Sequence, residues 1–212
     1  MRKAINAIVV SFWGAAVSAQ TLTIAALGDS LTQSYGLQAE DGFVPQLERW
    51  LIAQGMDVSL INAGVSGDTT AGGLSRAAWT LTPDVDAMIV TLGGNDLLRG
   101  IDPAASRANM DGILAAAQTA GVDVLVIGME APGNYGPEYK ASFDAIYPEL
   151  SQAYGTLYLQ SFFEGLGGAG TDPASLGEYM QADGIHPNPQ GVLQIVDGIG
   201  PKVLELIALV KN

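Results

Sequence analysis

Two alternating patterns of apolar residues run along the chain. Short runs of consecutive apolar residues, typical of strands buried on both faces of a parallel sheet, fall at 22–27, 58–62, 87–92, 122–128 and 156–159. Between them, apolar residues recur at spacings of three and four, which is the pattern of a helix with one buried face. Strands that alternate with helices favour a parallel sheet with right-handed crossovers. We therefore predict an α/β protein, a three-layer α/β/α sandwich around a five-stranded parallel sheet.

Capping residues and prolines predict where the helices begin and end. The chain from 162 to 183 is irregular and rich in glycine, and no internal repeat or linker divides the sequence. Helices are expected over 41–54, which Gly55 ends; from a cap at Asp68 or Thr69 to Pro83; from Asp102-Pro103 to Gly121; from near Pro137 to Gly155, with a kink at Pro148; and from Asn188-Pro189 onward.

The first nineteen residues have the composition of a secretory signal peptide. Arg2 and Lys3 precede a mostly apolar segment over 4–16, and Val17-Ser18-Ala19 forms a small-residue cleavage site. The apolar segment is shorter than the roughly twenty residues that cross a bilayer, which disfavours a membrane anchor. We predict a signal peptide over 1–19, a single domain over 20–212, and export to the periplasm or the medium.

Charge and cysteine content exclude several classes of function. Without 1–19 the chain has seven basic and 22 acidic residues, a formal net charge of −15, which disfavours binding to nucleic acid or to anionic lipid. The chain has no cysteine, so a thiol nucleophile and a cysteine-ligated metal site are both excluded.

The candidate nucleophile is Ser30, in Gly28-Asp29-Ser30-Leu31 at the end of the first predicted strand. A serine nucleophile needs a base and a group that orients the base. His186 is the one histidine of the chain, and Asp183 lies three residues before it, a spacing that suits a turn. Loops after the first three strands meet at one edge of such a sheet, so the backbone N–H groups of Ser30 and Gly67 and the side-chain amide of Asn95 are candidate oxyanion donors.

Several apolar residues are candidates for contacts with an acyl chain. Leu97, Leu98 and Ile101 follow Asn95 and would form either an apolar wall for substrate or part of the core. Pro132 and Tyr135 are further substrate-binding candidates, whereas a core position is the expectation for Phe162.

Four blocks of sequence resemble the signature blocks of the SGNH (GDSL) hydrolases, in the order of that family: Gly28-Asp29-Ser30-Leu31, Ser66-Gly67-Asp68-Thr69, Gly93-Gly94-Asn95-Asp96 and Asp183-Gly184-Ile185-His186-Pro187-Asn188. Further segments at 62–69, 92–100, 132–136 and 145–150 are similar to the bacterial periplasmic thioesterase/lysophospholipase/arylesterase branch.

This resemblance implies a monomer of flavodoxin-like fold that hydrolyses esters and thioesters without a cofactor or metal. It assigns catalysis to Ser30, Asp183 and His186 and the oxyanion hole to Ser30, Gly67 and Asn95. Glu130-Ala131-Pro132 departs from that branch, which often has a basic residue and a larger apolar residue there. This departure argues against a preference for long acyl chains.

Two other enzyme or binding classes fit the sequence poorly. An α/β-hydrolase would need Gly-x-Ser-x-Gly, which the chain lacks, and a nucleotide-binding flavodoxin relative would need a phosphate-binding loop longer and less acidic than Gly28-Asp29-Ser30. A carbohydrate acetylesterase of the same fold and a non-catalytic periplasmic binding protein remain alternatives.

Overall fold

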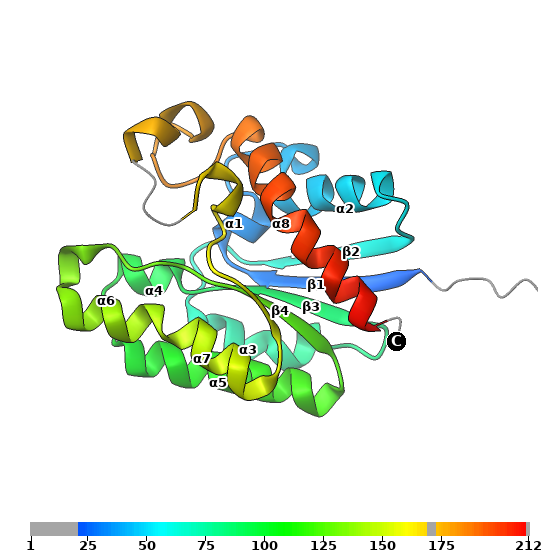
Figure 1. Cartoon of the computed structure of the whole chain (residues 1–212), viewed down its shortest axis with the longest axis horizontal. Coiled ribbons are helices and arrows are strands. Elements are labelled where there is room, and N and C mark those ends of the chain that lie inside the picture. The colour runs from blue at the N-terminus through cyan, green and yellow to red at the C-terminus, as the bar shows by residue number, and fades with distance from the viewer. Residues whose placement is uncertain (1–20, 169–172, 211–212) are drawn as a thin grey trace, which may run out of the picture.

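The computed structural model describes residues 21–168 and 173–210 (Figure 1). The expected signal peptide at 1–19 lies outside these residues. Among the helices of the two described stretches, none combines the length and the apolar character that crossing a bilayer requires.

Five parallel strands form one sheet at the centre of the fold, as the apolar runs predicted (Figure 1). Their order across the sheet is β2-β1-β3-β4-β5. Gly28, the last residue of β1, lies in register with Gly64 of β2 and with Thr91 of β3. The loops that follow these three strands therefore leave the sheet side by side. The strands are β1 (Leu22–Gly28), β2 (Val58–Gly64), β3 (Ala87–Thr91), β4 (Asp123–Ile127) and β5 (Leu157–Leu159).

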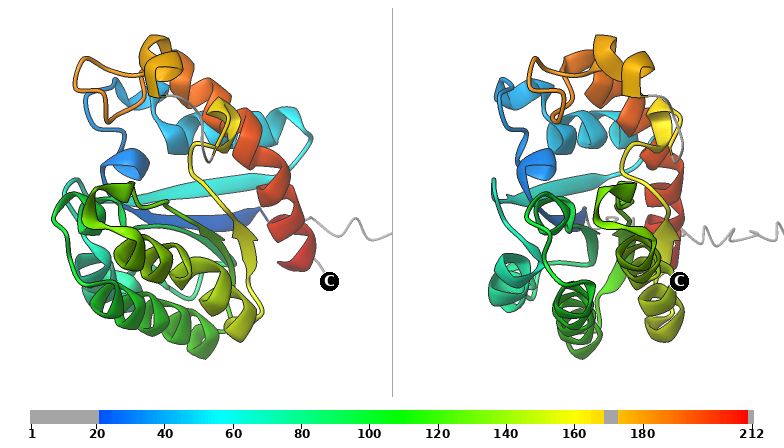
Figure 2. Two further views of the ribbon diagram at one scale, coloured as in Figure 1. Left: turned by 60° about the vertical axis from the view of Figure 1, so that its left-hand side comes forward. Right: turned by 90° about the vertical axis from the view of Figure 1, so that its left-hand side faces the viewer.

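Helices cover both faces of the sheet and complete the expected three layers (Figures 1 and 2). Helices α2 (Phe43–Ala53) and α8 (Pro189–Val210) pack against each other on one face. The other face carries α3 (Thr70–Thr80), α5 (Pro103–Ala120), α6 (Pro137–Asp144) and α7 (Ile146–Tyr154). Two short helices, α1 (Ser30–Gln33) and α4 (Gly94–Leu98), follow β1 and β3 directly.

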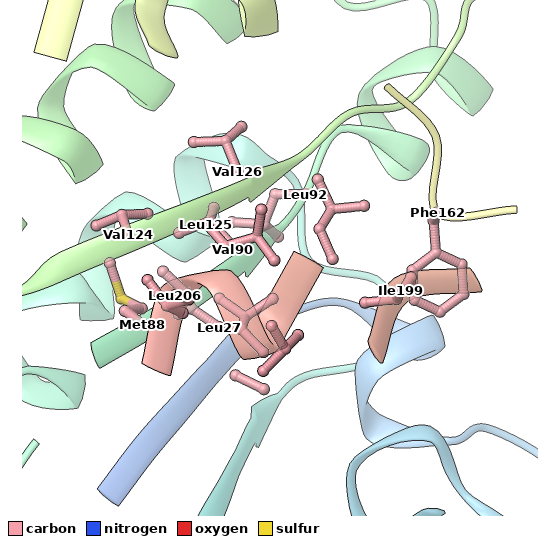
Figure 3. Close-up of a cluster of buried hydrophobic side chains, with 14 of the residues drawn as sticks. Leu27, Met88, Val90, Leu92, Val124, Leu125, Val126, Phe162, Ile199 and Leu206 are labelled. Atoms are coloured by element: carbon pink, nitrogen blue, oxygen red, sulfur yellow. The ribbon is translucent and has the colours of Figure 1, made fainter. Parts of the chain in front are cut away.

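The core lies between the sheet and its helices, and Figure 3 shows part of it. Leu27, Val90 and Val126 come from three neighbouring strands, and Ile199 and Leu206 of α8 belong to the same cluster. Phe162 is fully buried and packs edge-on against Phe43 of α2, so its predicted core position is confirmed. Burial of large apolar side chains stabilises a fold by about 1.5–3 kcal/mol each.

The structure corrects one predicted helix and decides between the two predicted caps of another. The helix expected over 137–154 is two helices, α6 and α7, which meet at Ala145. Pro148 explains this break, because it has no N–H to donate to the carbonyl of Asp144 and its ring would clash there. The cap of α3 is Thr69, whose hydroxyl accepts from the N–H of Gly72, while Asp68 pairs with Arg76.

No sequence pattern predicted the short elements. Helices α1 and α4 each span about one turn, which is too short for a periodic pattern. Turns of 3-10 helix, also unpredicted, occur at Ala39–Asp41, Gly133–Tyr135, Glu164–Leu166 and Pro173–Tyr179.

Candidate active site

The turn that carries Ser30 is built by its two neighbours. Asp29 is the N-cap of α1, and its carboxylate accepts from the N–H of Leu31 at 3.0 Å. A side chain at Gly28 would place its Cβ 2.0 Å from the hydroxyl of Thr32 and 2.9 Å from the carbonyl oxygen of Thr91. Close packing therefore requires glycine at position 28.

Folding brings Ser30 and His186 together although they are 156 residues apart in the sequence. The Oγ of Ser30 lies 2.8 Å from Nε2 of His186, and Nδ1 of His186 lies 2.7 Å from the carboxylate of Asp183. These three side chains form one continuous hydrogen-bonded chain. Tyr35 packs against the imidazole, with ring centroids 4.8 Å apart.

The Asp183 carboxylate is held by a local turn. One of its oxygens accepts from the backbone N–H groups of Ile185 and His186, at 2.9 and 3.0 Å. The backbone hydrogen bond from His186 is the main reason that the pKa of Asp183 is lowered to about 2, and the bond to the His186 side chain adds to it. Asp183 therefore stays ionised at neutral pH and can stabilise an imidazolium.

A second carboxylate, Asp29, lies beside the nucleophile but serves a different purpose. Its side chain is only 1% exposed, and burial raises its pKa to about 6. Hydrogen bonds from the Leu31 N–H and the Asn95 amide oppose this rise. Its second oxygen accepts from Nδ2 of Asn95 at 3.3 Å, so Asp29 orients both the turn and the Asn95 amide.

The three candidate oxyanion donors lie on neighbouring loops at the carboxyl ends of β1, β2 and β3. Ser30 is the first residue of α1, where backbone N–H groups have no partner within a helix. Gly67 has a φ of +83°, a left-handed conformation that side chains other than glycine rarely adopt. The Nδ2 atom of Asn95 carries two hydrogens, and the contact with Asp29 uses one of them.

Hydrogen bonds to Asp96 connect the loop of Gly67 with the loop of Asn95. Its buried carboxylate accepts from the N–H and the hydroxyl of Thr70, at 2.9 and 2.6 Å, and from the hydroxyl of Ser106 at 2.8 Å. Thr70 begins α3, just after the Gly67 loop, and Ser106 belongs to α5. The network therefore fixes two candidate oxyanion donors relative to each other.

A cavity of about 670 Å³ is lined in part by the segments that follow β1, β3 and β4, and Ser30 itself is not among its lining residues. Four of the predicted substrate-binding residues line it, namely Leu97, Leu98, Pro132 and Tyr135. Leu31, next to the nucleophile, is also part of its wall. Ile101 is not among the lining residues; its carbonyl accepts from the hydroxyl of Tyr139. In the part of the chain that the structure describes, no cluster of His, Asp or Glu side chains is arranged to hold a metal ion.

Comparison with known proteins identifies the family of this site. Residues 26–192 match the GDSL-like Lipase/Acylhydrolase family. The chain belongs to this family. The match includes all four sequence blocks and covers most of the described fold.

Relatives of this hydrolase carry names of ester-cleaving enzymes. The chain is 36% identical over 191 residues to "Esterase TesA" of Pseudomonas aeruginosa, which covers 90% of both proteins. It is 33% identical over 194 residues to "Thioesterase 1/protease 1/lysophospholipase L1" of Escherichia coli K12, covering 91% of this chain and 87% of that protein. Among solved structures, AlinE4, an SGNH-hydrolase family esterase, is 39% identical with a TM-score of 0.72, covering 88% of this chain and 97% of that one. The protein is accordingly an SGNH hydrolase that acts on esters.

Some residues of this hydrolase's site were missed by sequence reasoning. Met129, Phe163, Leu176 and Ile185 line the cavity, and Tyr35 covers one face of His186. Only Ile185 offered a signal, because an apolar residue between Asp183 and His186 must lie close to them. The other residues come from segments whose patterns are equally typical of a core.

Proposed function

We propose that the protein is a serine esterase that forms an acyl-enzyme on Ser30, with His186 as the base and Asp183 as its orienting acid. The hydrogen-bonded chain from Ser30 through His186 to Asp183 supports this proposal above all other observations. A nucleophile, a base and an orienting carboxylate in contact are what acyl transfer by serine requires.

In the first half of the reaction, Nε2 of His186 accepts the proton of the Ser30 hydroxyl as Oγ attacks the ester carbonyl. The Nδ1–H group then donates to ionised Asp183, which stabilises the imidazolium. Negative charge develops on the carbonyl oxygen, where the N–H groups of Ser30 and Gly67 and the amide of Asn95 would donate. The ester C–O bond breaks, and the imidazolium gives its proton to the departing alcohol or phenol.

In the second half, a water molecule attacks the acyl-enzyme. His186 takes a proton from this water, and the same donors stabilise the second oxyanion. The bond between the acyl carbon and Oγ of Ser30 breaks, the serine regains its proton, and the carboxylic acid leaves. A thioester would follow the same steps with a thiol as the leaving group.

The cavity supports aryl and short-to-medium acyl esters as the main substrates. Its walls include the apolar residues Leu31, Leu97, Met129, Phe163 and Leu176, which would contact an acyl chain longer than acetyl. Acyl thioesters and lysophospholipids are further proposed substrates. Glu130 also lines the cavity and accepts from the Gln160 amide, and a carboxylate there disfavours a long apolar chain.

Hydrolysis of p-nitrophenyl esters from acetyl to palmitoyl, together with one acyl-thioester, tests the proposal. We expect the highest kcat/KM at short to medium length and a steep decline for palmitoyl. The Ser30→Ala and His186→Ala variants should lose nearly all turnover and remain folded. A matched Ser75→Ala variant, which changes an exposed serine on α3, should keep the wild-type rate.

An active-site-directed phosphonate distinguishes an enzyme from a binding protein. We expect it to add to Ser30 in the wild type and to leave the Ser30→Ala variant unlabelled. A wild type that neither reacts with the phosphonate nor cleaves any ester of the series would contradict the catalytic proposal. Release of acetate from acetylated sugars, without activity on butyryl or longer esters, would instead identify a carbohydrate acetylesterase.

We further propose that the mature protein begins after residue 19, is exported without a membrane anchor, and is a monomer. N-terminal sequencing of the protein from the periplasm or medium of an expressing cell should start at Gln20. Light scattering of this mature form should give the mass of one chain.

A further inference from the structure

Arg76 has no role in the proposed chemistry, yet it contacts three segments that build the site. It lies on α3, its side chain reaches the carboxyl ends of β1 and β2, and this side chain is 22% exposed. Nη2 donates to the carbonyl of Gly28 at 2.7 Å, Nη1 to the carbonyl of Ala63 at 2.5 Å, and Nε to the carboxylate of Asp68 at 2.6 Å. Each nitrogen of its guanidinium therefore holds a different segment.

Each of these acceptors lies within four residues of a residue of the site. Gly28 is two residues before Ser30, and its carbonyl also accepts from the N–H of Val65. Ala63 stands near the end of β2, where the loop to Gly67 begins, and Asp68 follows Gly67 directly. The guanidinium thus joins the end of the nucleophile strand to both sides of the loop that presents the Gly67 N–H.

The chemistry of arginine suits this task. Its planar group presents donors in a fixed geometry, whereas a lysine ammonium is a single point charge on a flexible stem. Hydrogen bonds between charged and polar groups are also among the stronger ones in proteins. Arg99 holds the middle of this loop, since its Nη2 donates to the carbonyl of Gly67 at 2.8 Å, whereas Arg76 holds its two sides at Ala63 and Asp68.

We propose that Arg76 is a positioning residue that fixes the Gly67 N–H relative to Ser30 and so sets the geometry of the oxyanion hole. This inference rests on the proposed function of Ser30 and Gly67. Because the oxyanion exists only in the transition state and the intermediates, a displaced donor lowers kcat and leaves KM nearly unchanged.

The test compares Arg76→Gln and Arg76→Lys with Arg107→Gln, which removes an arginine from a surface ion pair with Glu149. We expect Arg76→Gln to lower kcat on p-nitrophenyl butyrate by about tenfold to a hundredfold, with KM within about threefold of the wild type. The kcat of Arg76→Lys should lie between those of Arg76→Gln and the wild type, and the kcat of Arg107→Gln should equal that of the wild type. A further variant, Arg76→Ala, leaves space for a free guanidinium ion. Millimolar guanidinium should restore part of the kcat of Arg76→Ala and should not change the kcat of Arg107→Gln.

Hydrogen exchange measured by mass spectrometry gives a second readout that needs no turnover. Exchange of the peptide that spans 64–69 should be faster in Arg76→Gln than in the wild type, and unchanged in Arg107→Gln. Unchanged exchange there, or a kcat equal to that of the wild type, would overturn the proposal. The proposal would also be overturned if the loss of kcat in Arg76→Gln is fully explained by the fraction of that variant that is unfolded, as measured by thermal denaturation.

The two proposals fail in different ways. If the wild type itself cleaves no ester, the proposed function is wrong, and the exchange experiment alone then decides whether Arg76 holds the Gly67 loop. If the wild type and Arg76→Gln turn over equally well while Ser30→Ala is inactive, only the role of Arg76 is wrong.

Discussion

Replacement of Asp29 by Asn should change how the stability of the protein depends on pH. The buried carboxyl keeps its proton up to a pH of about 6 in the folded state, whereas its ordinary pKa is 3.8. Between these values the folded state binds more protons than the unfolded state, so the contribution of Asp29 to stability is fully present below pH 3.8 and is lost as pH rises through about 6. At about 1.4 kcal/mol per pH unit, this loss amounts to about 3 kcal/mol.

Urea denaturation of the wild type and Asp29→Asn at several pH values measures this effect. Most of the loss, about 2 kcal/mol, should occur between pH 4 and pH 7 in the wild type and be absent from the variant. The difference between the two proteins cancels the other carboxyl groups, which both retain. A difference that stays constant across this range would refute the argument that burial of Asp29 controls its titration.

Asn95→Ala provides an independent check on the same group. The Asn95 amide lowers the pKa of Asp29, so its removal should raise that pKa further and move the loss of stability to higher pH. If the unfolding free energy of Asn95→Ala depends on pH as that of the wild type does, the contact between Asn95 and Asp29 does not influence the pKa of Asp29.

Three more predictions concern the acid, the buried network and metals. Asp183→Asn should lower kcat on p-nitrophenyl butyrate, but less than Ser30→Ala does, because the imidazole remains in place while its cation loses a charged partner. Because the pKa of Asp183 is lowered from 3.8 to about 2, this carboxylate also stabilises the fold above pH 3.8, and the contribution is lost as pH falls through about 2. The difference in unfolding free energy between the wild type and Asp183→Asn should therefore decrease in acid. A difference that does not change with pH would contradict the lowered pKa of Asp183. Asp96→Asn leaves a single oxygen to accept from the N–H and hydroxyl of Thr70 and the hydroxyl of Ser106. The free energy of unfolding in urea should therefore fall by about 2–3 kcal/mol. A decrease under about 0.5 kcal/mol would show that this network adds little to stability. Dialysis against EDTA should leave ester hydrolysis unchanged, and a rate restored only by added metal would exclude the proposed mechanism.

Local sequence patterns predicted most of the fold. The apolar runs around Leu27, Val90 and Val126 located the central strands, because a strand buried on both faces has almost no polar positions. The cap and proline at Asp102-Pro103 and the glycine at Gly121 bound α5 as expected. The break between α6 and α7 was placed three residues too late, although Pro148 was recognised, because the effect of a proline falls on the carbonyl four residues before it.

The candidate site was only partly accessible from sequence. Ser30, Asp183 and His186 could be named because the chain has one histidine and because an acid three residues away suits a turn. The partner of Asp68 could not be named, since a helix cap and an ion pair use the same carboxylate and Arg76 lies eight residues away. The contact of Asp29 with Asn95 could not be predicted from a local pattern either, because the two residues are 66 positions apart in the sequence.

The sequence by itself determined where the strands and the longer helical segments lie, in which order they follow, and which residue types are available for acyl transfer. These properties depend on apolar periodicity, caps and prolines, all of which act over a few neighbouring residues. Only the tertiary structure decided which residues meet: that Ser30 reaches His186, that Arg76 joins three segments, and which loops enclose the cavity. Such contacts depend on strand order and on packing between distant elements, and no pattern within one segment encodes them.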